Sequence, residues 1–200
     1  MSKNVYDDLW IDILKNNEIS LSEKSITLLK KIFKPKLLKK DTFFLQEGEK
    51  STEIGVVVKG IFRSYYIDKA GKDTTKYFYK EGGVLFSYVA HLSQKESMYY
   101  IQALEDSEII VAQISDFEKI VEGNYELLLF YKKMIDSVLI MKEEHAISFK
   151  ALDSIERYKQ FLNAYHGLEK RIKQYHIASY LGMTPVSLSR LRKNFNINKL

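Results

Sequence analysis

The stretch Ile172–Lys193, which reads IKQYHIASYLGMTPVSLSRLRK, carries the spacing that decides the fold. Ile177 and Leu181 lie four residues apart, so they share one face of a short helix. Gly182 follows directly, at a position where a helix can end in the left-handed conformation. The stretch therefore predicts a short amphipathic helix that stops at a glycine turn.

A second helix is expected two residues after the turn. Thr184 is a good N-cap, and Pro185 is favoured at the first position of a helix. Leu188 and Leu191 then recur at helical spacing and mark an inner face. Two short helices joined by a tight glycine turn form a helix-turn-helix.

The outer face of this second helix is polar and basic, and suits DNA chemically. Small polar groups near a helix start can contact phosphates, and an arginine can reach a base edge or a phosphate. The alternative is an ordinary helical hairpin with a solvated basic face, and the spacing alone does not exclude it. The outward side chains are Ser187, Arg190, Arg192 and Lys193.

The run Ala178–Arg190, ASYLGMTPVSLSR, resembles the helix-turn-helix of the cyclic-AMP receptor/fumarate-nitrate regulator (Crp/Fnr) family. It is most similar to the branch in which HIASYLG is followed by TPVSLSR. The resemblance implies a transcriptional regulator that binds double-stranded DNA as a homodimer, with RNA polymerase as a further candidate partner. It also implies a sensor domain upstream and a small-molecule effector that the sequence does not identify.

Specific DNA contacts follow from this resemblance. Thr184 and Ser187, and more loosely Tyr175, match phosphate-contacting positions, while Arg190 matches a base- or phosphate-contacting arginine. Pro185 and Val186 stand where better-known members place a base-reading Arg and Glu, so a different target sequence is expected. The chain ends at Leu200, so little or no β-hairpin wing is expected. The expected DNA-binding residues are Tyr175, Thr184, Pro185, Val186, Ser187, Arg190, Arg192 and Lys193.

Charge is distributed unevenly along the 200 residues. Residues 155–200 hold nine Lys/Arg and two Asp/Glu, a balance of +7, whereas residues 1–154 hold 22 and 24, a balance of −2. A basic C-terminal module on a near-neutral body indicates a polyanionic partner. No apolar run is long enough to span a membrane and no signal peptide is visible, so the cytoplasm is expected.

The chain contains no cysteine, which excludes disulfides, thiol nucleophiles and cysteine-ligated iron–sulfur clusters. The oxygen-sensing branch of the resembled family uses such a cluster, so that mode of sensing is not expected. The four histidines lack metal-ligand spacing, and we expect no metal and no cofactor. Enzymatic function is not expected either, because no phosphate-binding glycine loop or nucleophile elbow is present.

Residues 5–34 are expected to be helical, with Ser22 near the start of a second helix. Residues 37–115 change to short apolar runs separated by turns, which is typical of a β sandwich or barrel. Gly48-Glu49, Ile54–Gly60 and Ile61-Phe62-Arg63 resemble the opening of a cyclic-nucleotide-binding jelly roll. The expected strands are Thr42–Leu45, Glu53–Val58, Ile61–Ile67, Thr74–Phe78, Val84–Phe86, Tyr99–Ala103 and Glu108–Ile114.

Helical spacing returns after residue 115. Asp116 is expected to cap a short helix that ends near Gly123, and a long helix begins near Tyr125. Apolar positions along the long helix alternate at spacings of four and three, which indicates a coiled-coil-like seam. A contact with the chain's own jelly roll is the alternative, for which Leu128, Ile135 and Leu139 could serve. The expected dimer seam is Leu127, Tyr131, Met134, Val138, Met141 and His145.

Asp153 and Glu156 have the spacing of a capping box, which predicts a fresh helix and a hinge before it. The resulting expectation is an α+β fold: an N-terminal cyclic-nucleotide-binding-like β jelly roll, a long dimerisation helix and a helical helix-turn-helix domain. The expected boundaries are 1–123 for the sensor domain, 124–152 for the long helix and 153–200 for the DNA-binding domain.

The sensor pocket departs from the resembled family. Members that bind a cyclic nucleotide use a Gly-Glu pair for the ribose and an Arg-Ser/Thr pair for the phosphate, which needs a cation. Here Ser87-Tyr88 and Ser97-Met98 stand in those places, and no arginine lies between Arg63 and Arg157. We therefore expect cyclic-AMP binding to be lost. The expected effector-pocket residues are Phe86, Ser87, Tyr88, Ser97, Met98, Tyr100 and Gln102.

A second function fits the same residues. The chain could be a ligand- or protein-binding sensor whose helix-turn-helix no longer reads DNA, which the missing Arg-Glu pair favours. The basic C-terminal quarter argues against it, and strong salt-sensitive DNA binding would exclude it.

Overall fold

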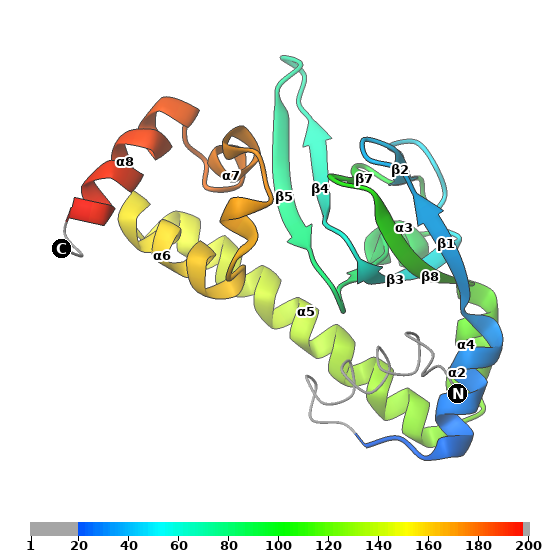
Figure 1. Ribbon diagram of the computed structural model, residues 1–200. Coiled ribbons are helices and arrows are strands. Elements are labelled where there is room, and N and C mark those ends of the chain that lie inside the picture. Colours follow the sequence, from blue (N-terminus) through cyan, green and yellow to red (C-terminus); the bar gives the residue numbers. More distant parts are fainter. Residues whose placement is uncertain (1–19, 198–200) are drawn as a thin grey trace. The chain divides into compact units, whose positions relative to one another are not determined.

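The computed structural model describes residues 20–197, with side chains described as far as Asn194. The part of the expected N-terminal helices before residue 20 lies outside this range. The chain forms two compact units (Figure 1). The first unit comprises the chain up to Arg63 together with Tyr79–Val138, and the second comprises Ser64–Phe78 and the residues from Leu139 onward. These units divide the chain at other points than the expected domain boundaries, which remain a prediction.

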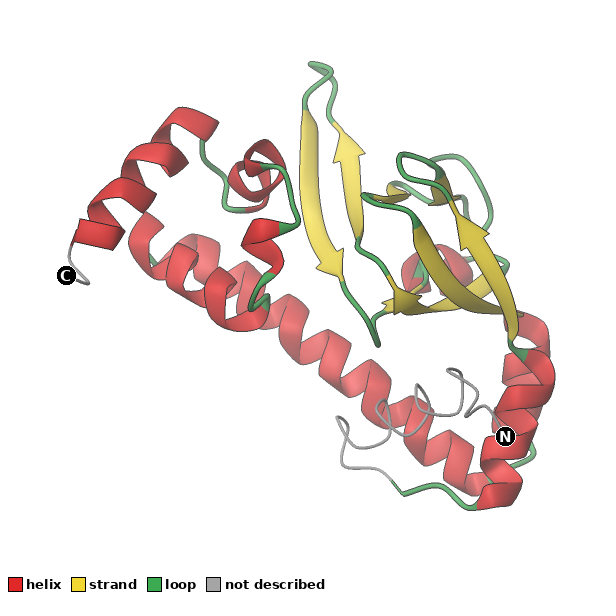
Figure 2. Ribbon diagram, in the orientation of Figure 1, coloured by secondary structure: helices red, strands yellow, loops and turns green. Residues whose placement is uncertain are grey.

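Eight strands form two four-stranded sheets (Figure 2). The first sheet has the order β1-β8-β3-β6 and the second has the order β2-β7-β4-β5. The chain passes from the first unit into the second within β4. The strands are β1 (Lys34–Leu38), β2 (Phe43–Leu45), β3 (Glu53–Lys59), β4 (Phe62–Ile67), β5 (Asp73–Tyr79), β6 (Val84–Leu85), β7 (Tyr100–Ala103) and β8 (Ser107–Gln113).

Both faces of the first sheet are buried, which explains why its strands lack a polar alternation. Val56 pairs with Ile110 across the antiparallel β3–β8 ladder, and both pack against helices. Their neighbours Val57 and Ile109 point to the other face and join the core between the sheets. Successive side chains of a strand point to opposite faces, so a strand covered on both sides is apolar throughout.

Three helices of the first unit cover the outer face of this sheet: α2 (Glu23–Ile32), α4 (Ile114–Glu122) and the beginning of α5 (Tyr125–Ala151). Ser22 caps α2 as expected, since its side chain accepts from the Ser25 backbone N–H. Asp116 does not cap α4. The helix begins two residues earlier, at Ile114, and Asp116 lies in its first turn, where a carboxylate is also favourable.

Two elements of the first unit were not expected from the sequence. Strand β1 contains Pro35 and two lysines, residues that are uncommon in strands, but it pairs along its whole length with β8. Helix α3 (Tyr88–Ser93) lies inside the segment expected to hold a ligand. Its six residues are too few for helical periodicity to reveal it.

The first half of the expected seam on α5 packs against its own chain, whereas Val138 and Met141, farther along the seam, are exposed at 36% and 38%. Leu127 is fully buried in the helix-covered core of the first unit, and Tyr131 and Met134 pack on the same core. Leu127 is therefore not available to a partner subunit. Leu128 and Leu139, which the sequence offered as the contact with the jelly roll, are instead exposed at 46% and 64%. The spacing could not say which of these positions the chain itself covers.

The second unit holds α6 (Ser154–Ala164), the short 3-10 helix η1 (Leu168–Lys170), α7 (Gln174–Tyr180) and α8 (Pro185–Ile197). The expected capping box is present at the start of α6, where Asp153 and Glu156 each accept from the other's backbone N–H. Phe78 of β5 contacts three aromatic rings of α6, its C-cap and α7, with centroid distances of 5.5–6.2 Å. This aromatic contact attaches the β4–β5 hairpin to the helices of its own unit.

Candidate nucleic-acid interface

Helices α7 and α8 form the expected helix-turn-helix around an apolar centre. Ile177 and Leu181 on one side and Leu188 on the other are at most 2% exposed. Ser179 fixes α7 to β5, because its hydroxyl accepts from the Thr75 N–H at 2.9 Å and donates to the Asp73 carbonyl at 3.2 Å. The first helix is thus held on two sides, and the second is positioned by its contact with the first.

The turn between the two helices depends on Gly182. This residue has φ +69°, in the left-handed region that favours glycine. A Cβ built there would lie 2.7 Å from Cε1 of Phe149 on α5. The sequence predicted the left-handed turn, but the contact with a ring 33 residues earlier could only be found in the structure.

Thr184 caps α8, as expected. Its Oγ1 accepts from the Ser187 backbone N–H at 3.1 Å, and the two hydroxyls are 2.8 Å apart. Pro185 follows at the first helical position, where a missing N–H is harmless. The cap leaves both hydroxyls at the exposed start of a 13-residue helix, where helix polarity favours anions.

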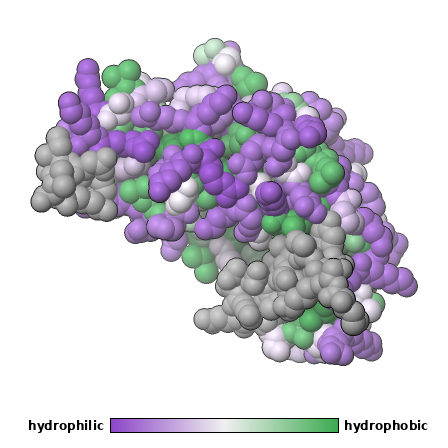
Figure 3. Space-filling view, viewed as in Figure 1, coloured by the Kyte–Doolittle hydropathy of each residue, from purple (hydrophilic) through white to green (hydrophobic). Residues whose placement is uncertain are grey.

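The outer face of α8 is exposed over three turns and carries two cations beside one apolar residue. Val186, Arg190 and Lys193 are all exposed, and Val186 is 60% exposed. The exposed surface over the C-terminal helices is largely hydrophilic in Figure 3. Arg190 and Lys193 therefore present positive charge along the same face of the helix, one and two turns after its capped start, an arrangement that suits a phosphate backbone.

Arg192 and Tyr175, two of the expected DNA contacts, differ in their exposure. Arg192 is only partly exposed, and its guanidinium lies beside Tyr158 of α6. Burial raises the pKa of the Tyr158 hydroxyl, while the charge and hydrogen bond of Arg192 lower it. Arg192 thus holds α8 against α6 rather than facing outward. Tyr175 is 49% exposed, with Lys173 Nζ 5.8 Å from its ring centre, so it keeps its expected place at the surface.

In the first unit, the structure brings Ser87 and Ser97 together. Both are buried, and the Ser97 hydroxyl donates to the Ser87 hydroxyl at 3.5 Å and more closely to the Tyr99 carbonyl, at 2.8 Å. The Ser87 backbone N–H donates to Ser51 Oγ at 3.2 Å. Ser87, at the expected ribose position, and Ser97, at the expected phosphate position, are therefore bonded to groups of the protein itself.

The other expected pocket residues do not converge on one point. Met98 is 78% exposed, and Tyr100 packs against Phe43 with ring centres 5.7 Å apart. Gln102 accepts from the buried Arg63 at 3.3 and 3.4 Å. Phe86 and Tyr88 contact each other, with ring centres 6.1 Å apart. Apart from the exposed Met98, these side chains are used in packing and internal hydrogen bonds.

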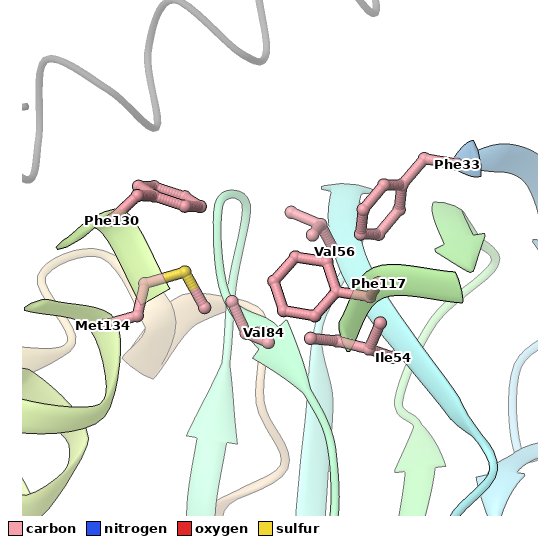
Figure 4. A pocket seen from close by; sticks show the side chains of 7 residues that line it. All are labelled: Phe33, Ile54, Val56, Val84, Phe117, Phe130 and Met134. Carbon is pink, nitrogen blue, oxygen red and sulfur yellow. The ribbon is translucent and has the colours of Figure 1, made fainter. Parts of the chain in front are cut away.

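A small cavity in the first unit lies between β3, α4 and α5, where seven apolar side chains converge (Figure 4). Its volume is about 10 Å³, roughly that needed to hold one water molecule. Such a space is a packing gap, too small for a nucleotide. The lining residues are Phe33, Ile54, Val56, Val84, Phe117, Phe130 and Met134.

The helices from α2 to α8, as far as the structure describes them, include none long and apolar enough to cross a membrane. Over the same part of the chain, no three His, Asp or Glu side chains are grouped so that they could hold a metal ion.

Residues 35–124 match the protein family described as the cyclic nucleotide-binding domain. This range covers the strands from β1 to β8 together with α3 and α4, and it includes Ser64–Phe78, which belong to the second unit. No curated protein sequence matches the chain.

Solved structures share the fold over most of the chain. FixK2 from Bradyrhizobium japonicum superposes with a TM-score of 0.73 at 20% identity, covering 84% of this chain and 86% of its own. CooA from Carboxydothermus hydrogenoformans gives 0.68 at 19% identity, with coverages of 98% and 85%. A protein from Eubacterium rectale, described as a transcriptional regulator of the crp/fnr family, gives 0.66 at 16%, with coverages of 92% and 87%. The α+β architecture, with sandwich, long helix and C-terminal helices, is therefore the one found in these proteins.

Proposed function

We propose that the protein is a sequence-specific, DNA-binding transcriptional regulator of the Crp/Fnr type that acts as a homodimer. The observation that carries this proposal is the outer face of α8. Its capped start presents the Thr184 and Ser187 hydroxyls, and Arg190 and Lys193 follow on the same exposed surface. Hydroxyls and cations at a helix start are the groups that contact phosphates and base edges.

The base contacts should differ from those of family members that place Arg and Glu at the positions of Pro185 and Val186. Pro185 has no side-chain hydrogen-bonding group, and Val186 offers only apolar atoms, 60% exposed. An apolar side chain in the major groove can contact a thymine methyl group. Arg190 is then the principal candidate for a hydrogen-bonded base contact.

We also propose that the sensor domain does not bind cyclic AMP. A cyclic phosphate carries a negative charge that requires a cation or converging N–H donors. Arg63 is buried and bonded to Gln102, and the hydroxyl of Ser97 is held by the Tyr99 carbonyl. In isothermal titration, cyclic AMP up to about 1 mM, the upper end of weak specific affinity, is expected to give no saturable heat. Saturable binding would refute this part of the proposal.

The homodimer is supported by exposed apolar side chains on α5. Leu128, Leu139, Ile140 and Ile147 of α5 are 46–64% exposed, whereas Leu127 and Phe130 at the start of the helix are buried in the chain's own core. A row of exposed apolar residues is typical of a protein interface. Two helix-turn-helix units are also what a palindromic site needs, with half-sites about one helical turn apart.

The deciding experiment is selection from a random double-stranded DNA pool, followed by fluorescence anisotropy at several salt concentrations. A palindromic consensus with a steep salt dependence is the expected result. The selection is run in buffer and again with cell extract added as a source of effector. Weak binding without sequence preference under both conditions would instead favour the second function. In that case the protein is a sensor whose helix-turn-helix no longer reads DNA, a function that the apolar Pro185 and Val186 favour.

A further inference from the structure

The β4–β5 hairpin ends in an exposed turn that the proposed function does not use. Every residue from Tyr66 to Lys72 is exposed, and this turn belongs to the second unit together with the helix-turn-helix. In Figure 1 the tip of the hairpin and the beginning of α8 both lie at the upper end of that unit. The turn is therefore a candidate for a second contact with the partner of α8.

Asp68 gives this turn a defined structure. Its Oδ1 accepts from the backbone N–H groups of Ala70 and Lys72, each at 2.9 Å. Its own N–H donates to the Lys72 carbonyl at 3.0 Å, and the N–H of Gly71, which has φ +77°, donates to the Asp68 carbonyl at 2.9 Å. A carboxylate that bonds to the backbone of its own turn stabilises that turn. The tip of the hairpin is thus an ordered support for the side chains on it.

Lys69 and Lys72 give the turn exposed positive charge. Neither side chain forms an ion pair or a hydrogen bond with another residue that the structure describes. Over Tyr66–Lys72 the two lysines give +2 and Asp68 gives −1, so the balance is +1, and the carboxylate of Asp68 is already bonded to the turn. Exposed ammonium groups of this kind bind phosphates, because each contact releases a counterion from the DNA.

The base of the hairpin is bonded directly to the helix-turn-helix. Asp73 follows Lys72, and its carbonyl accepts from the Ser179 hydroxyl of α7 at 3.2 Å. That hydroxyl accepts in turn from the Thr75 N–H at 2.9 Å. The carbonyl of Ser179 accepts from the N–H of Gly182, in the turn before α8, at 3.1 Å. One residue of α7 therefore bonds to both the hairpin and that turn, which holds Lys72 at a fixed place relative to the beginning of α8.

The hairpin leaves the expected DNA-contacting surface open. Tyr175 of α7 is 49% exposed and Val186 of α8 is 60% exposed. Thr184 and Arg190 are exposed as well. A hairpin that lay across α7 and α8 would bury these side chains, whereas a hairpin beside them adds positive charge next to the same surface. The exposure of these residues therefore favours a contact that extends the DNA-binding surface over one that blocks it.

We propose that Lys69 and Lys72 of the β4–β5 turn contact the phosphate backbone of DNA beside the bases that α8 reads. This inference rests on the proposed DNA-binding function and adds to it a contact from outside the helix-turn-helix. Phosphate contacts position a protein on the duplex and carry no sequence information directly. Each lysine should therefore contribute to the affinity for every sequence and to the salt dependence of binding.

The position of the hairpin on DNA can be tested by directed cleavage. The chain has no cysteine, so one introduced cysteine can carry a DNA-cleaving iron–EDTA group at a chosen site. Ala70→Cys places this group on the turn and keeps both lysines. With the full chain bound to its selected consensus, cleavage is expected at a defined backbone position beside each half-site. The cysteine-free wild-type chain, treated with the same reagent, is the control and should give no cleavage.

Charge variants test the lysines themselves. The double variant Lys69→Gln/Lys72→Gln is expected to weaken binding about tenfold or more at about 0.1 M salt, equally on consensus and scrambled DNA. It should also reduce the slope of log K against log salt concentration by about two. Lys50→Gln/Lys95→Gln removes the same charge from exposed positions of the first unit, so it is the matched control and should bind like wild type.

The outcomes separate this inference from the proposed function. If wild type binds a consensus but Lys69→Gln/Lys72→Gln keeps its affinity and slope, or Ala70→Cys cleaves at no defined position, the inference is overturned and the DNA-binding function stands. Tyr66 and Ile67, 40% and 46% exposed, would then point to a protein partner for the hairpin. Tighter DNA binding by the double variant would show that the hairpin opposes binding and would also overturn the inference. A wild-type chain that binds no DNA would overturn both proposals.

Discussion

Arg190 and Lys193 lie three residues apart on the exposed surface of α8, yet we expect them to act differently on DNA. Arg190→Ala should weaken binding to the selected consensus by about 1–3 kcal/mol and relax the preference at one base position. Lys193→Ala should weaken binding equally on all sequences. It should also reduce the slope of log K against log salt concentration by about one. Anisotropy titrations on the consensus and on scrambled DNA measure both effects. An Arg190→Ala protein with unchanged affinity and preference would remove Arg190 from base reading.

Gly182 offers a second test at the same scale, because its neighbours make it more constrained than Gly167, another left-handed glycine. Gly167 of the same unit has φ +80°, and no atom lies within 4 Å of the position that a Cβ would occupy there. Gly167→Ala should therefore cost only about 1–2 kcal/mol of backbone strain. Gly182→Ala should cost roughly 1–3 kcal/mol more, since a methyl group there must displace the Phe149 ring. Urea unfolding of both variants measures the difference.

A double variant tests whether the Phe149 ring causes the extra destabilisation of Gly182→Ala. Adding Phe149→Ala to Gly182→Ala removes the atom that the new methyl group meets, so the extra destabilisation should disappear in the double variant. If the two substitutions prove additive, the contact between the turn and α5 does not limit the residue at 182.

Among the elements, α2 and α5 are joined by one carboxylate. Glu126 accepts from the Ser22 hydroxyl at 2.6 Å, the Ser25 hydroxyl at 2.5 Å and the Ser22 backbone N–H at 3.2 Å. These hydrogen bonds, those of Ser22 first, lower the pKa of Glu126 below its ordinary value of 4.5. A depressed pKa in the folded state means that the stabilisation is complete above that ordinary value and is lost as the pH falls below it.

Glu126→Gln should therefore reduce the stability at pH 7 and flatten its decline in acid, because glutamine cannot lose a proton to gain charge. Urea unfolding between about pH 3 and pH 7, the range spanning the usual carboxylate titration, measures both curves. The exposed Glu122→Gln, four residues earlier, is the control and should follow the wild-type curve. Parallel curves for Glu126→Gln and wild type would mean that the link between the two helices does not depend on charge.

Helix α5 also shows where prediction from the sequence stops. The start near Tyr125 could be predicted, and in the structure Asn124 accepts from the N–H groups of Glu126 and Leu127 at that point. The four-three spacing predicted one apolar seam, of which Leu127, Tyr131 and Met134 pack on the core and Val138 and Met141 are exposed. Spacing contains no information about what covers a face, however, and Leu127 and Leu128 were assigned to the wrong sides. Only tertiary packing distinguishes a core residue from an exposed one of the same type.

For the candidate site, prediction from sequence succeeded where the chemistry is local. The turn at Gly182 and the cap at Thr184 depend on neighbouring residues, and both were found as expected. Arg192 was assigned to the outside because its partner, Tyr158, is 34 residues away. A cavity of about 300 Å³ in the second unit could not be predicted for the same reason, because its lining residues come from α5, α6 and α7 and the segments next to them.

At the scale of the whole molecule, the exposed apolar side chains on α5 make the oligomeric state the decisive property. Leu139 is 64% exposed, and Leu139→Lys would place a charge in the proposed interface, where desolvation opposes it. We expect this variant to be a monomer in sedimentation velocity and to lose cooperative binding to a palindrome. Ser137→Lys, an exposed position on another side of α5, is the control and should remain dimeric. A monomeric wild-type protein would contradict the proposal at once.

The close approach of Gly182 to Phe149 also bears on how this sequence can diverge. A side chain at 182 can be accommodated only after the ring at 149 has become smaller or has moved, so the order of the two substitutions matters. A lineage that first loses the ring can then sample residues such as Asn at the turn, whereas the reverse path passes through a destabilised intermediate. Substitutions at positions 149 and 182 are thus expected to be correlated, although the two residues are 33 positions apart in the sequence.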